Sequence, residues 1–149
     1  MQTKTVSQSR FLFLVKYKGF ITDLVVYAFI ILFMYTAASK LFTIDSFAST
    51  LSKSPLIGRY GLAMAWTIPT LEIAISFLLV LDLSRKWSIP VATGLMLIFT
   101  AYLSYMVLSG SKLPCHCGGL ISALTWSQHI WFNIGFITLG FLGLWANKK

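Results

Sequence analysis

The sequence predicts an all-α membrane protein, a bundle of four transmembrane helices, and three observations support this fold class. Hydrophobic residues make up 57% of the chain and charged residues only 11%, which leaves too few charged side chains to cover a soluble protein. The mean hydropathy is +0.79. The apolar residues also gather into long blocks, each close to the roughly 20 residues that cross the hydrocarbon core of a bilayer.

Taken in order, these blocks are the predicted helices. They run over residues of about 20–41, 61–83, 89–108 and 126–146. Strands are excluded because no block alternates with period two and an open sheet cannot satisfy its edges in lipid. The first block is too long for a signal-peptide core and no Ala-x-Ala motif follows it, so we expect it to stay attached. With no internal repeat, residues 1–149 are expected to form one domain.

The connection between the first two blocks contains a different pattern. Phe47 and Leu51 are four residues apart among Ser, Thr and Lys, and Pro55 closes the run. This spacing places both apolar side chains on one face of a helix. We therefore expect a short amphipathic helix within Ile44–Leu56, lying on the outer surface of the membrane.

The basic residues predict the orientation of the chain. The two tails and the turn after the second block carry more of them than the other two connections, and basic residues are enriched in cytoplasmic loops. Both termini are therefore expected in the cytoplasm, for a multi-pass protein of the bacterial inner (cytoplasmic) membrane. The first group is Lys4, Arg10, Lys16, Lys18, Arg85, Lys86, Lys148 and Lys149, and the second is Lys40, Lys53, Arg59 and Lys112.

The net charge of +8 is consistent with this placement. The basic side chains flank the apolar blocks, where they can meet anionic head groups of membrane lipid. No basic stripe or nucleic-acid-binding motif occurs, so we expect no nucleic-acid partner.

The most specific local motif is Pro114-Cys115-His116-Cys117-Gly118-Gly119, in the predicted outer loop before the last helix. It contains the only two cysteines of the chain. A disulfide across one intervening residue closes a small, strained ring, and strained, exposed disulfides are the exchangeable ones. As a cation, His116 would lower a thiol pKa and favour the reactive thiolate. We therefore predict Cys115, Cys117 and His116 as a thiol–disulfide exchange site.

Two alternatives remain for this motif. The cysteines could form a structural bridge that pins the loop, although so short a span removes little chain entropy. A copper or zinc site would use Cys115, Cys117 and His116, with or without His129. A lone Cys-x-Cys with two uncommitted histidines is a weak pattern for a metal, and His129 is more simply a residue inside the bundle, so we predict no metal site.

Glu72 is the second candidate. It lies about eleven residues into the second block, roughly 16 Å along a helix and so near mid-membrane. A carboxylate there is costly and marks a functional position by default. Pro69 frees the carbonyl of Ala65 and so creates a polar spot inside the bundle. We expect Lys40 and Glu72 either to form a structural pair or to relay protons, or else a protonated Glu72 to donate to the freed carbonyl.

The sequence does not identify a cofactor. Aromatic residues of the apolar blocks could line a quinone pocket, although most are expected to pack or contact lipid. The tyrosines concerned are Tyr27, Tyr35, Tyr102 and Tyr105.

With these features in order, the chain resembles the MauE branch of the DoxX-like membrane proteins, a family of small bacterial four-helix proteins. The resemblance spans nearly the whole chain. It rests on Ala37-Ala38-Ser39-Lys40-Leu41-Phe42, on Phe47, Leu51 and Ser54-Pro55-Leu56, on Ile68-Pro69 and Glu72-Ile73, on the Cys-x-Cys-Gly element, and on Trp126 and Asn133. The sequence departs from the family at His116, where a small residue is common, and at Gly119, where an aromatic is common.

The resemblance implies a cytoplasmic-membrane protein associated with thiol–disulfide traffic. One relative helps mature a disulfide-rich methylamine dehydrogenase subunit, and others accompany thioredoxin-like proteins. We therefore expect a periplasmic thioredoxin-like or cysteine-containing partner. The alternative is a non-enzymatic subunit or assembly factor of a larger envelope complex. Vitamin K epoxide reductase-type enzymes, which pair cysteines at the end of a bundle with a quinone, are an analogy only.

Overall fold

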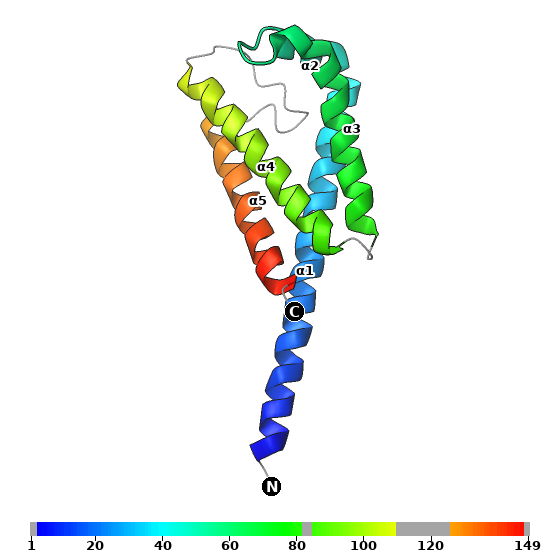
Figure 1. Ribbon diagram of the computed structural model, residues 1–149, viewed down its shortest axis with the longest axis vertical. Coiled ribbons are helices and arrows are strands. Elements are labelled where there is room, and N and C mark those ends of the chain that lie inside the picture. Colours follow the sequence, from blue (N-terminus) through cyan, green and yellow to red (C-terminus); the bar gives the residue numbers. More distant parts are fainter. Residues whose placement is uncertain (1–2, 82–84, 110–125, 148–149) are drawn as a thin grey trace.

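The computed structural model describes residues 3–81, 85–109 and 126–147, and these form helices joined by turns, with no strand in the described ranges (Figure 1). Four of the helices are long and apolar enough to cross a membrane. The elements are α1 (Thr3–Phe42), α2 (Ile44–Ser52), the 3-10 helix η1 (Gly58–Tyr60), α3 (Gly61–Val80), α4 (Arg85–Leu108) and α5 (Trp126–Asn147). The predicted four-helix membrane fold is thus confirmed.

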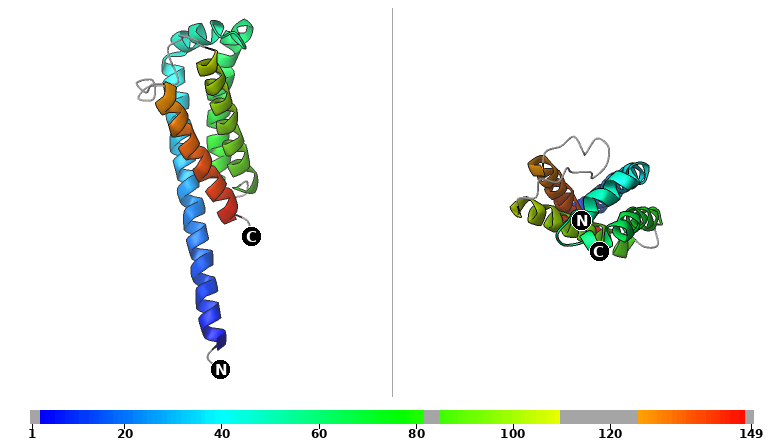
Figure 2. Two further views of the ribbon diagram at one scale, coloured as in Figure 1. Left: turned by 90° about the vertical axis from the view of Figure 1, so that its left-hand side faces the viewer. Right: turned by 90° about the horizontal axis from the view of Figure 1, so that it is seen from above.

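The helix boundaries differ most at the N-terminus. The candidate membrane span of α1 is Tyr17–Phe42, close to the predicted block, but the helix itself begins at Thr3. Figure 2 shows this extension of α1 continuing beyond the other helices. Hydropathy reports where a helix meets lipid, whereas backbone hydrogen bonds can continue through polar residues, and a segment without Pro or Gly favours this. The first 14 residues of α1 contain neither.

The bundle has two distinct ends. α1 ends, α3 begins, α4 ends and α5 begins at the same end of the bundle as α2, and we call this the α2 end (Figure 1). α1 enters the bundle and α5 ends at the opposite end, which we call the terminal end.

A close-packed apolar core occupies the terminal half of the bundle. Val25 and Phe29 of α1 lie there with Leu79 of α3 and Ile89 of α4, all at most 1% exposed. The Phe29 ring meets the ring of Phe136 on α5 edge to face, with centroids 5.8 Å apart. In lipid this packing is driven by van der Waals contact, because the acyl chains outside are equally apolar.

Glycine permits close helix approach in this half. A Cβ on Gly143 of α5 would lie 2.8 Å from Cγ1 of Val25 on α1. Small residues at helix interfaces let two backbones approach in this way. In contrast, a Cβ on Gly135 would have no neighbour within 4 Å.

The predicted amphipathic helix is present as α2. Phe47 and Leu51 are buried, and they pack with Ala65 of α3. The helix ends at Ser52, earlier than the predicted Leu56, because the chain turns there: the Ser54 amide donates to the Leu51 carbonyl at 3.0 Å. Figure 2 shows α2 lying across the α2 end of the bundle.

Candidate functional site

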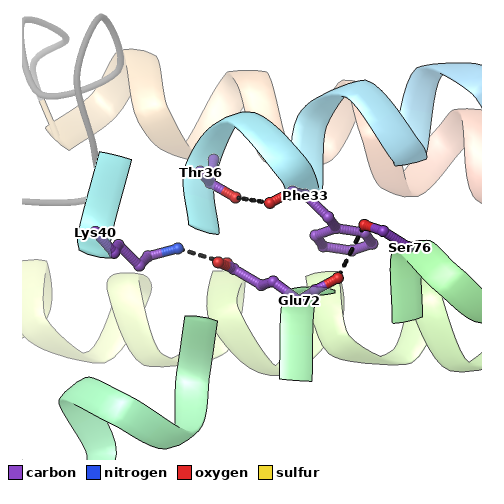
Figure 3. A network of polar contacts seen from close by, with 5 residues as sticks. All are labelled: Phe33, Thr36, Lys40, Glu72 and Ser76. Atoms are coloured by element: carbon purple, nitrogen blue, oxygen red, sulfur yellow. Dashed lines mark hydrogen bonds and ion pairs between the residues drawn. The ribbon is translucent and has the colours of Figure 1, made fainter. Parts of the chain in front are cut away.

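An ion pair lies inside the bundle, toward its α2 end. Lys40 comes from the last turn of α1 and Glu72 from the middle of α3, and both side chains are buried. The Lys40 Nζ donates to Glu72 Oε1 (Figure 3). The predicted contact between these residues is present, while its role as a structural pair or a proton relay stays a prediction.

Neighbouring polar groups surround the carboxylate incompletely. The Thr36 hydroxyl donates to the Phe33 carbonyl at 3.2 Å, and the Ser76 hydroxyl donates to the backbone carbonyl of Glu72 at 2.9 Å (Figure 3). Glu72 Oε2 has no hydrogen-bond partner among the described residues. A buried charge pair with one unsatisfied oxygen is costly to keep, so it contributes little to stability and needs another explanation.

Pro69 does not have the predicted effect on Glu72. Pro69 is buried within α3, which continues through it to Val80. The carboxylate bonds to Lys40 and not to the carbonyl of Ala65, so the alternative of a protonated Glu72 bonded to that carbonyl is wrong. A charged partner within reach satisfies an ionised carboxylate better than a carbonyl, which can only accept.

α5 contributes two polar side chains that our sequence analysis did not connect with this site. His129 and Asn133 are four residues apart and buried, with exposed fractions of 6% and 3%. Neither ring nitrogen of His129 has a hydrogen-bond partner among the described residues. The available signal was the spacing, because His and Asn at i and i+4 in an apolar helix share one face, and polar residues within a membrane span usually face the bundle interior.

One cavity of about 380 Å³ is lined by Thr36, Lys40, Glu72, His129 and Asn133. Residues of α1, α2, α3, α4 and α5 enclose it. Most of its wall is aliphatic or aromatic. The polar lining residues are Thr36, Lys40, Glu72, Tyr102, His129 and Asn133. An apolar cavity with a few convergent polar groups is the usual form of a small-molecule site.

The cavity reaches the side of the bundle. Leu71 of α3 and Ile98 of α4 both line it, and they are also 47% and 65% exposed. Both residues lie well inside their candidate membrane spans, Gly58–Val80 and Trp87–Leu108. Their outer faces therefore meet lipid rather than water, and access from this side is access from the membrane.

The predicted tyrosines divide between two environments. Tyr102 lines the cavity, and its hydroxyl donates to Ser54 Oγ at 3.0 Å. Tyr27, Tyr35 and Tyr105 do not line the cavity and are more than 40% exposed on the bundle surface. This agrees with the expectation that most of these aromatic residues pack or contact lipid, because their helices turn those faces outward.

Cys115, His116 and Cys117 lie outside the described residues. The segment that contains them joins the end of α4 to the start of α5, and both of these helix ends lie at the α2 end (Figure 1). Within the described ranges, no three His, Cys, Asp or Glu side chains gather closely enough to hold a metal ion.

Comparison with curated proteins and with solved structures finds no match. The model of a protein family described as methylamine utilisation protein MauE matches residues 18–146. This range covers the ion pair, the cavity, the cysteine motif and nearly all of the four candidate membrane spans. The chain therefore belongs to the MauE family and is a multi-pass membrane protein linked by that family to methylamine utilisation.

Proposed function

We propose that this chain lies in the bacterial inner membrane and that Cys115 and Cys117 exchange a disulfide with a periplasmic partner. The partner is a thioredoxin-like or another cysteine-containing protein. The observation that carries this proposal is the motif itself: the only two cysteines of a MauE-family chain stand two residues apart, with His116 between them. The connection between α4 and α5 that contains them is 17 residues long, residues 109–125, and the helix ends that it joins both lie at the α2 end.

The exchange is balanced in atoms and electrons. A thiolate of one protein attacks the disulfide of the other and forms a mixed disulfide, which a second thiolate then resolves. Two thiols of one protein become a disulfide while the other protein gains two thiols. His116, as a cation, stabilises the attacking or leaving thiolate. The charge bias of the loops supports an α2 end in the periplasm, where disulfides persist.

Trapping of the mixed disulfide tests this proposal. A Cys115→Ser or Cys117→Ser variant retains one thiol that can attack but cannot resolve, so one of the two should accumulate a covalent complex that disappears on reduction. Non-reducing gels and mass spectrometry of the purified full-length protein identify the partner. The double Cys→Ser variant is the matched control and should give no complex.

Two results would oppose the proposal. In the first, both single variants leave the thiol states of envelope proteins unchanged. In the second, a stoichiometric partner still co-purifies with the double Cys→Ser variant, and this variant keeps any activity that is measured for the parent protein. That second result would instead assign the chain to a larger membrane complex in which the cysteines are structural.

A further inference from the structure

We infer that the cavity binds a lipid-soluble quinone, with the quinone head group among Glu72, His129 and Asn133. The inference concerns a site made entirely of described residues. It rests on the proposed function only for the source of electrons, and its binding part stands alone.

The first argument is the unmet hydrogen bonding of the cavity. Glu72 is 1% exposed and has one unpartnered carboxylate oxygen, and His129 is 6% exposed with both ring nitrogens unpartnered. Buried polar groups are nearly always hydrogen-bonded, so three orphan atoms on two residues that line one cavity point to a ligand that supplies partners when these side chains turn toward it. Lys40 and Asn133 line the same cavity, and both side chains carry hydrogen-bond donors.

The charge of the cavity wall favours a neutral ligand. Lys40 and Glu72 cancel one another, and the remaining lining residues carry no fixed charge. A phosphate or carboxylate head group would therefore bring an uncompensated charge into an apolar cavity, which is unfavourable. A neutral head group that both accepts and donates hydrogen bonds fits better. A quinone offers two carbonyl acceptors and its reduced form offers two hydroxyl donors, and a neutral imidazole and an amide can serve both forms.

The cavity has the size and the position to admit a ligand from the membrane. A cavity of about 380 Å³ is large enough for a single ring with its substituents. Its wall reaches the lipid-facing side of the bundle at Leu71 and Ile98. A molecule dissolved in the bilayer can enter there and leave its apolar tail in lipid, whereas a water-soluble substrate would have to cross the acyl chains.

The fourth argument is the chemistry of the lining residues. Reduction of a quinone to a quinol takes up two electrons and two protons, and oxidation of two thiols to a disulfide releases two electrons and two protons. Glu72 and His129 are side chains that can bind and release protons next to the head group. Thiols oxidised under the proposed function would supply the electrons, and the products would be a disulfide and a quinol.

Photolabelling of the purified full-length protein tests the binding. The double Cys→Ser variant is reconstituted in nanodiscs of phosphatidylcholine, labelled with an azido-benzoquinone that has a ten-carbon tail, and mapped by mass spectrometry. We expect labels on the segments of α3 and α5 that contain Glu72 and His129, and we expect decyl-benzoquinone to compete for them. Because this variant has no thiols, the result does not depend on the thiol proposal.

Substitutions in the wall sharpen the test. His129→Phe and Asn133→Leu each remove hydrogen-bonding groups and should weaken competition by decyl-benzoquinone by about tenfold. Thr138→Val changes an exposed residue of the same helix outside the cavity and should have no effect. Ile98→Trp, at an exposed position that tolerates a large side chain, should narrow the entrance and also weaken labelling.

Three outcomes would overturn the inference. Labels could spread over the lipid-facing surface without competition, phosphatidylglycerol could compete as well as decyl-benzoquinone, or the wall variants could bind like the parent protein. Binding without any thiol exchange would contradict the proposed function alone. Thiol exchange without binding would contradict this inference alone.

Discussion

The terminal half and the α2 half of the bundle consist of the same apolar helices, but they are packed in opposite ways. At the terminal end, Val25, Phe29 and Leu79 are almost fully buried and Gly143 lets α5 approach α1 closely. Toward the α2 end, the same helices enclose a cavity with a buried ion pair and orphan polar atoms. Natural proteins tend to lose stability where function needs a polar or open site. We therefore propose that the terminal half stabilises the bundle and that the α2 half contains the functional site.

The largest expected effect comes from breaking the ion pair. Lys40→Met leaves Glu72 buried near mid-membrane without its partner, and removal of one member of a buried pair costs about 3–5 kcal/mol. Titration with denaturing detergent measures the loss in the free energy of unfolding. Glu72→Leu should cost less, because Lys40 lies at the end of α1 and its long side chain can turn toward the interface.

Two controls make this result interpretable. The double Lys40→Met/Glu72→Leu variant should recover most of the loss, and Lys53→Met, at an exposed lysine, should change little. Equal stability of Lys40→Met and the parent protein would contradict the expectation that removal of Lys40 leaves an uncompensated buried charge on Glu72.

The next largest effect on the free energy of unfolding is expected from substitutions of two glycines of α5. Gly143→Ala places a Cβ against Val25 and should lower the free energy of unfolding by about 1–3 kcal/mol, as overpacking does. Gly135→Ala meets open space, so the helix preference for Ala over Gly should raise stability by up to about 1 kcal/mol. The same detergent titration checks both. Opposite signs support the packing difference, and equal effects would contradict it.

The smallest expected changes in the free energy of unfolding should have opposite signs in the two halves of the bundle. His129→Phe removes two orphan nitrogens from the cavity wall and should raise the free energy of unfolding by about 1 kcal/mol. Phe29→Leu trims a fully buried ring in the terminal half and should lower it by about 1 kcal/mol. Destabilisation by both would indicate that His129 has a structural role in the empty protein.

The four membrane-spanning helices could be predicted from the sequence, because a helix that crosses lipid must be about 20 residues long and mostly apolar. The position of α2 was also predictable, since Phe47 and Leu51 had to share a buried face. The N-terminal extension of α1 was missed because hydropathy does not report where a helix ends outside the membrane.

The candidate site was only half predictable. A single carboxylate near mid-membrane needs a cation as its partner, so Glu72 indicated Lys40, the nearest cation, as the residue that would contact it. His129 and Asn133 could be assigned to one helix face, but the neighbour of that face depends on how α5 is rotated against the other helices. A cavity is also a space that side chains leave unfilled, which only their joint packing decides. For the same reason, the sequence could not single out Tyr102 from Tyr27, Tyr35 and Tyr105 as the tyrosine that lines the cavity.

The central claim is that the α2 end faces the oxidising compartment and presents reactive sulfurs there. Intact cells are treated with a mild reductant, and a membrane-impermeant maleimide is then applied from outside, with a single-cysteine variant, Cys115→Ser or Cys117→Ser, in each sample. We predict that each remaining cysteine is labelled from outside, while the double variant is not labelled. Labelling only after the cytoplasm is opened would contradict the claim.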